Sequence, residues 1–186
     1  MTKAIIILLL LSGYSGIMNE PGIDYSPRLL HRELTTFFRS GDYSIKEFAG
    51  EDVSKGSSLT SGKFFSIRNA EGGNIIAYIG RVNSCRAGGC SNPSLAGTEN
   101  ESEYFDYFIL FDSEKKVMLV RVFNYAATHG QEVSVKRWLD QFAGYVGAKP
   151  LRVGKEIDAI SGATISVYAL VADVQEKTLL LNKQKP

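Results

Sequence analysis

The sequence predicts an α+β fold, in which a mostly antiparallel sheet built from hairpins has helices packed on it. Its 186 residues are enough for one domain with a sizeable hydrophobic core. Two pairs of apolar, β-branched stretches are each joined by a short turn, which is the pattern of β-hairpins. Stretches with helical spacing precede and follow the hairpins, and strands do not alternate with helices as in a parallel sheet. We therefore expect a single domain over residues 25–182.

The first expected element is a helix between Ser26 and Gly41. Ser26 is a candidate N-cap, Pro27 suits the first helical position, and Gly41 is suited to follow the last turn. The face expected to be buried consists of Leu30, Leu34, Phe37 and Phe38. A short strand over 42–48 follows, because apolar and polar residues alternate there.

The two hairpins come next. Residues 63–68 and 74–82 are separated by Asn-Ala-Glu-Gly-Gly, in which the glycines suit a turn. Residues 103–111 and 116–125 form the second pair, and their apolar, β-branched character predicts two central strands.

Two further helices are expected after the hairpins. Residues 134–147 place Trp138, Phe142 and Tyr145 at helical spacing, and we expect Trp138 in the core. The last helix follows Gly162, and its apolar face consists of Val167, Leu170, Val171 and Val174.

The charge balance excludes some classes of partner. The chain has 21 Lys and Arg against 20 Asp and Glu, a net charge of +1. Such a chain has no strong field to attract a polyanion, so we expect no nucleic-acid partner.

The N-terminal residues 1–16 have the order of a secretory signal. Lys3 is followed by an apolar run over 4–11 and then by small residues. The run is far shorter than the ~20 residues that span a bilayer. The alternative is a buried strand or helix of the core. We expect export, to the periplasm or the extracytoplasmic face of a membrane, with the segment either cleaved or kept as an anchor.

Export gives the two cysteines, Cys85 and Cys90, a structural interpretation. Outside the cytoplasm, a close pair predicts a disulfide, and Gly88 and Gly89 allow a tight loop between them. A redox-active pair is the alternative, although the spacing differs from the two-residue spacing of thioredoxin-like motifs. A zinc or iron–sulfur site usually needs about four ligands, so no metal site is expected.

The stretch Asp-Ala-Ile-Ser-Gly-Ala-Thr, residues 158–164, lies where an extended segment meets the last helix. Asp158 and Ser161 are candidate caps of that helix, and Gly162 permits a close backbone approach. The first helical turn presents unpaired N–H groups and the positive end of the dipole, which together favour a phosphate. Thr164 therefore places a hydroxyl beside a potential phosphate site.

This stretch resembles the attachment motif of the FMN-binding domain family. The family includes the flavin subunits of bacterial ion-pumping NADH:quinone and ferredoxin:NAD oxidoreductases, and stand-alone exported relatives. In it, an FMN transferase joins the phosphate of FMN to the last threonine of the motif through a phosphoester bond. The resemblance implies covalent FMN on Thr164, with Asp158, Ser161, Gly162 and Ala163 completing the recognition sequence. It also implies an FMN transferase as the partner in maturation.

The resemblance extends over residues 104–175. Family members commonly carry a His and a Glu followed by a Pro-Gly-Leu-Gly turn. This chain keeps His129 and Glu132 but lacks that turn, so the surroundings of the flavin are expected to differ there. The N-terminal third, with the cysteine loop, has no match in the respiratory subunits, and their membrane-spanning helix is not seen in the sequence.

These observations favour an exported, membrane-associated electron-transfer flavoprotein. Its redox donor and acceptor are not identified by the sequence, and either one can be membrane-bound. One alternative is an extracytoplasmic FMN-dependent reductase of a small acceptor, with His129 assisting. Another is a non-redox binding module or a thiol–disulfide protein that uses Cys85 and Cys90. No substrate pocket can be derived from the sequence and no catalytic residue is assigned, so a role as enzyme stays open and an electron carrier is favoured.

Overall fold

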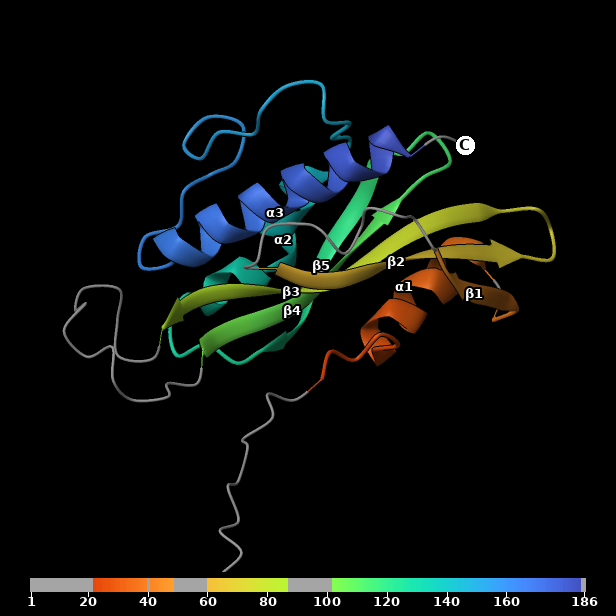
Figure 1. Ribbon diagram of the computed structural model, residues 1–186, viewed down its shortest axis with the longest axis horizontal. Helices are drawn as coiled ribbons and strands as arrows, with labels where there is room; N and C mark the ends of the chain where they lie inside the picture. Colours follow the sequence, from red (N-terminus) through yellow and green to blue (C-terminus); the bar gives the residue numbers. More distant parts are fainter. Residues whose placement is uncertain (1–21, 40, 49–59, 87–101, 185–186) are drawn as a thin grey trace, which may run out of the picture.

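The computed structural model describes residues 22–39, 41–48, 60–86 and 102–184. In these residues, a five-stranded antiparallel sheet has the strand order β1-β2-β3-β4-β5. The helix α1 lies on one face of the sheet, and α3 crosses the opposite face together with α2 (Figure 1). The predicted α+β fold, with helices packed on an antiparallel sheet, is therefore confirmed.

The elements follow one another without any strand–helix–strand alternation. In chain order they are α1 Arg28–Phe38, β1 Tyr43–Glu47, β2 Thr60–Asn69, β3 Asn74–Arg86, β4 Ser102–Phe111, β5 Val117–Tyr125, the 3₁₀ turn η3 Gln131–Ser134, α2 Lys136–Leu139, the 3₁₀ turn η4 Asp140–Phe142 and α3 Thr164–Lys183. Each strand pairs with the one before it in the chain, so every step along the sheet is a local one.

Successive strand residues point to opposite sides of the sheet. Both sets of side chains are buried, one against α3 and the other against α1. The face toward α3 is apolar and aromatic, and its strand residues include Phe64, Tyr78, Val82, Phe105, Tyr107, Ile109 and Phe111. The face toward α1 packs against Leu30, Leu34 and Phe38 of that helix, and its strand residues include Phe65, Ile67, Ile75, Ala77, Ile79, Phe108 and Leu110. The sheet is thus the middle layer of three.

The position of β5 differs from the prediction. It is apolar enough for a central strand, yet in the described sheet it is an edge strand. The chain that follows covers part of this edge, since the Val117 N–H donates to the Tyr145 carbonyl at 2.9 Å and the Gly144 N–H donates to the Val117 carbonyl at 2.8 Å. The 3₁₀ turns η3 and η4 also pack on β5, so helical segments bury its apolar residues in place of another strand.

The structure of α1 differs from the sequence-based expectation in three respects. Pro27 occupies the N-cap position of α1 without a side-chain cap bond, and the Ser26 hydroxyl instead pairs with His31 Nε2 at 2.6 Å. The helix ends at Phe38 because Arg39 adopts a left-handed conformation (φ 54°), two residues before the expected glycine. Phe37 is 47% exposed, so it does not belong to the buried face.

The expected helix over 134–147 is divided into short pieces. Val135 is extended (φ −68°, ψ 119°) and separates η3 from α2, while Ala143 (φ −60°, ψ 135°) ends η4. Trp138 is nonetheless in the core as predicted, with its ring edge-on to Phe142 at 5.6 Å between centroids. The apolar spacing was therefore correct, but packing against β5 favours compact turns over one continuous helix.

The helix α3 is held on the sheet by polar as well as apolar contacts. Its predicted apolar residues Val167, Leu170, Val171 and Val174 are buried. Farther toward the C-terminal end of the helix, Asp173 accepts a hydrogen bond from the hydroxyl of Tyr107 on β4 and forms an ion pair with Lys177 at 3.2 Å. Burial, and next the charge of Asp173, raise the pKa of Tyr107 well above its ordinary value, so the phenol keeps its proton and donates it.

Candidate functional site

The segment between η4 and α3 contains the predicted attachment motif and runs beside α3 (Figure 1). It contains a tight turn in which Val153 and Ile157 form a parallel bridge and the Gly154 N–H donates to the Ile157 carbonyl at 2.8 Å. Ile157 is fully buried. The Leu151 N–H donates to Oε1 of Gln175 on α3 at 2.8 Å, so the segment is attached to the helix that it leads into.

The helix α3 begins at Thr164, the last residue of the motif. Ala163 occupies the N-cap position and is 2% exposed, whereas Thr164 is exposed. The Val167 N–H donates to the Ala163 carbonyl at 2.9 Å, which is the first hydrogen bond of the helix. The N–H groups of 164–166 precede that bond and have no intrahelical acceptor. The Thr164 hydroxyl therefore lies on the surface, next to backbone donors at the positive end of the helix dipole.

The prediction that Asp158 or Ser161 caps α3 is wrong. No side-chain capping hydrogen bond forms at this helix start, and the N-cap residue Ala163 has no side-chain acceptor. Gly162 explains the difference, because its φ of +84° turns the chain directly before the helix and leaves Ser161 exposed. Around Gly162 there is open space, because apart from its two chain neighbours no residue has an atom within 4 Å of the place a Cβ would take. The turn thus leaves room in front of the helix.

Asp158 is held through its backbone. The indole Nε1–H of Trp138 donates to the Asp158 carbonyl at 2.9 Å, and the Asp158 N–H donates to Oε1 of Gln141 at 2.9 Å. The carboxylate is exposed, and in the described part of the chain it makes no hydrogen bond or ion pair. The side chain of Asp158 is therefore available to an external partner.

His129 lies in the loop that approaches the first turn of α3. The hydroxyl of Tyr125 donates to the His129 carbonyl at 2.6 Å and lies 3.2 Å from the hydroxyl of Ser166. Gly130 (φ +90°) packs so closely that a Cβ there would be 2.6 Å from Ser166 Oγ. The structure thus brings this loop beside α3 through backbone and hydroxyl groups.

The side chains of His129 and Glu132 are exposed. Within the described residues, no hydrogen bond or ion pair joins either of them to Thr164. The pKa of Tyr125, whose hydroxyl contacts both the loop and α3, is raised by partial burial, with a smaller opposing effect from its hydrogen bond to Ser166. Tyr125 is consequently a neutral hydroxyl between the loop and the helix.

Some predictions lie outside the described residues. The signal segment 1–16 and Cys90 belong to this part of the chain, and Cys85 is placed only as a backbone position of β3. The disulfide and the export signal therefore stay predictions. In the described residues, no group of three or more His, Cys, Asp or Glu side chains is arranged to hold a metal ion. Nor does any described helix have the length and apolar character needed to cross a membrane.

Comparison with known proteins found no match to a protein-family model and none to a curated protein.

Sequence reasoning missed two residues of the site. Trp138 was expected only as a core residue, and Gln141 was not singled out. A buried indole N–H needs an acceptor, so the sequence contained a signal that Trp138 has a polar partner. It contained no signal for Asp158 as that partner, since the two are 20 positions apart.

Proposed function

We propose that the protein is an exported flavoprotein that carries FMN covalently on Thr164 and acts in electron transfer. The observation that carries this proposal is the position of Thr164, which is exposed and is the first residue of α3. The same seven residues within a buried strand would be out of reach of a transferase. Here the hydroxyl, the exposed Asp158 and the exposed turn at Ser161 and Gly162 are all accessible from outside.

The attachment reaction forms a bond between Thr164 Oγ1 and the phosphorus of FMN. The hydroxyl loses its proton, and the bond from phosphorus to the leaving group breaks. Direct esterification by free FMN would release water and is unfavourable in water. The donor is therefore a flavin dinucleotide such as FAD, whose phosphoanhydride breaks and releases AMP. The FMN transferase catalyses this step.

The residues around Thr164 suit the attached group. The N–H groups of 164–166 and the helix dipole favour the negative charge of the phosphodiester. Ile165 is 43% exposed and Tyr168 is 57% exposed, one residue and about one helical turn after Thr164. They offer apolar and aromatic surface to a flat ring system. When bound, FMN supplies reversible uptake of electrons, and its tether prevents loss by dilution outside the cell.

The attachment site is tested with the full chain, expressed together with an FMN transferase and exported. Flavin fluorescence of the denatured protein in a gel reports covalent attachment. Thr164→Ala removes the ester oxygen, so we expect complete loss of this fluorescence with the fold preserved. Thr36→Ala is the matched control, because Thr36 is an exposed threonine of α1, and it should keep full fluorescence.

Fluorescence that persists in Thr164→Ala would contradict the assignment. The electron-transfer role is tested on the labelled protein, whose flavin absorbance should bleach with dithionite and return when a quinone is added. Catalytic turnover of small acceptors by the isolated protein would instead favour the reductase.

A further inference from the structure

We propose that Trp138 and Gln141 are positioning residues, which hold Asp158 by its backbone so that its carboxylate is presented to the transferase. The inference rests on the proposed function of Thr164, and it extends the recognition site to residues outside the motif. Neither residue contacts the threonine hydroxyl in the described hydrogen bonds, so both act through Asp158.

The three residues form a closed set of hydrogen bonds. Trp138 Nε1 donates to the Asp158 carbonyl at 2.9 Å, the Asp158 N–H donates to Gln141 Oε1 at 2.9 Å, and Gln141 Nε2 donates to the Trp138 carbonyl at 3.2 Å. Both backbone polar groups of Asp158 are thereby paired. Its exposed side chain takes no part in the set, so the identity of the side chain is not required by the fold.

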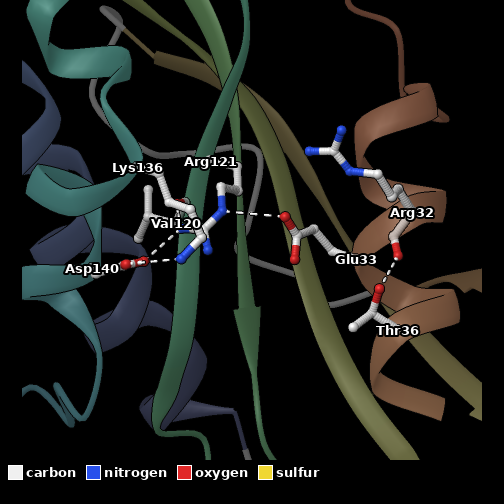
Figure 2. A network of polar contacts seen from close by, with 7 residues as sticks. All are labelled: Arg32, Glu33, Thr36, Val120, Arg121, Lys136 and Asp140. Carbon is white, nitrogen blue, oxygen red and sulfur yellow. Dashed lines mark hydrogen bonds and ion pairs between the residues drawn. The ribbon is translucent and has the colours of Figure 1, made fainter. Parts of the chain in front are cut away.

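The segment that holds Asp158 is itself attached to the rest of the molecule. Arg121 of β5 is 7% exposed, and Figure 2 shows it between two acidic residues from opposite sides of the sheet. Its Nη1 donates to Asp140 at 2.9 Å, and its Nε donates to Glu33 of α1 at 3.3 Å. Lys136 Nζ also donates to Asp140 at 2.9 Å. Asp140 is the residue before Gln141, so the position of Gln141 is fixed by charged contacts to β5 and, through Arg121, to α1.

Loss of these bonds would let residues near Asp158 adopt other conformations. A partner that recognises only one conformation binds with an apparent affinity reduced by the fraction of molecules in that conformation. The loss should therefore raise the apparent KM of the transferase for this protein and leave kcat unchanged. For one removed hydrogen bond, we expect an increase of roughly three- to tenfold.

The test measures initial rates of flavin incorporation into the full chain by purified FMN transferase with FAD, at varied concentrations of the chain. Gln141→Leu removes the acceptor of the Asp158 N–H and should raise the apparent KM. Gln141→Glu keeps an acceptor oxygen for the Asp158 N–H but loses the Nε2 donor to the Trp138 carbonyl, so its KM should be lower than that of Gln141→Leu. Trp138→Phe removes the indole donor, keeps an aromatic ring, and should behave like Gln141→Leu. Arg137→Gln, an exposed neighbour on α2, is the control and should have no effect.

Two further measurements separate positioning from general destabilisation. Hydrogen exchange of the Asp158 amide should become faster in Gln141→Leu, which shows directly that the bond is lost. In an Asp158→Ala background, Gln141→Leu should add no further increase in KM, because its effect passes through the missing carboxylate. An additive increase would overturn the proposal.

An unchanged KM in Gln141→Leu, combined with faster exchange at the Asp158 amide, would also overturn the positioning role of Gln141. The proposal that FMN is attached to Thr164 would not be affected by that result. A parent protein that takes up no flavin under these conditions would instead overturn the proposed function together with this inference. The two failures are therefore distinguishable.

Discussion

The two faces of the sheet bury charged groups in different ways. On the face toward α1, the buried pair lies within the sheet, because Arg81 and Asp106 are direct neighbours on β3 and β4. Arg81 donates to both carboxylate oxygens of Asp106 at 2.7 and 3.0 Å, and Asn124 donates to the same carboxylate at 2.8 Å. The ring of Tyr104 lies 3.6 Å from the guanidinium carbon. The core contacts of α1 with this face are mainly apolar, and its Glu33 accepts a hydrogen bond from Arg121 of β5 at 3.3 Å.

On the face toward α3, the buried charges connect the helix to the sheet. Asp173 and Lys177 of α3 are 2% and 3% exposed, and Asp173 is bonded to Tyr107 of β4. Hydrogen bonds depend on direction, whereas apolar contact does not. The bond from Tyr107 therefore restricts the rotation of α3 about its axis. In this orientation Thr164 and Tyr168 are exposed to solvent.

The largest expected effect comes from removing one cation on each face. Lys177→Met leaves Asp173 buried without its ion-pair partner, and Arg81→Met does the same to Asp106. Each should lower the free energy of unfolding by roughly 3–5 kcal/mol, measured by chemical denaturation. The two variants should differ in native-state hydrogen exchange, because Lys177 of α3 lies over the ring of Tyr78 on β3, 5.5 Å from its centroid, whereas Arg81 is paired within the sheet. The α3 amides of Lys177→Met should exchange faster than those of Arg81→Met.

The double variant Asp173→Asn/Lys177→Met is the control for the unpaired charge. It keeps an acceptor for Tyr107 and should be more stable than Lys177→Met alone. Equal exchange of the α3 amides in the two single variants would contradict the distinction between the faces.

A smaller effect on stability, with a larger one on function, is expected at Asp158. Because its side chain does not cap α3, Asp158→Ala should change the free energy of unfolding by less than about 0.5 kcal/mol. Flavin labelling of Thr164 should nevertheless decrease strongly. Glu71→Ala, an exposed carboxylate on the β2–β3 turn, is the control and should change neither quantity. A loss of stability without a loss of labelling would assign Asp158 a structural role.

The smallest effect concerns pH and the exposed pair Arg152 and Glu156, in the segment that leads to the motif. The hydrogen bond from Arg152 lowers the pKa of Glu156 to about 2. A carboxylate whose pKa is lowered by folding stabilises the folded state above its ordinary pKa of about 4.3, and loses this contribution as the pH falls to about 2. In that window, the Arg152 amide, which donates to Glu156 at 3.0 Å, should lose exchange protection.

Glu156→Gln is the matched variant, and protection of the Arg152 amide in it should not depend on pH in this window. The amides of α1 should not respond to acid in the same way, because this pair does not contact that helix. A pKa of Glu156 near its ordinary value, measured by NMR titration, would contradict the prediction.

The sequence by itself was sufficient for the fold class, for the approximate positions of all five strands, and for α1 and α3. These features depend on patterns within a few residues: alternation in the strands, three- and four-residue spacing in the helices, and glycine between β2 and β3. The buried residues Leu34 and Leu170 were predicted for the same reason. The exposed Thr164 at the start of α3 also follows from local pattern, since the motif directly precedes a helical repeat.

Only the tertiary structure decided the remaining features. The edge position of β5, the division of 134–147 into short helical pieces and the backbone bonds to Asp158 all depend on groups distant in the chain. The burial of Asp173 and Lys177 is the clearest case, because a charged pair in a helix normally faces water. It is buried here because β4 supplies Tyr107 as a third partner, 66 positions away. A local pattern carries no information on such a partner, since packing across the sheet determines which groups meet.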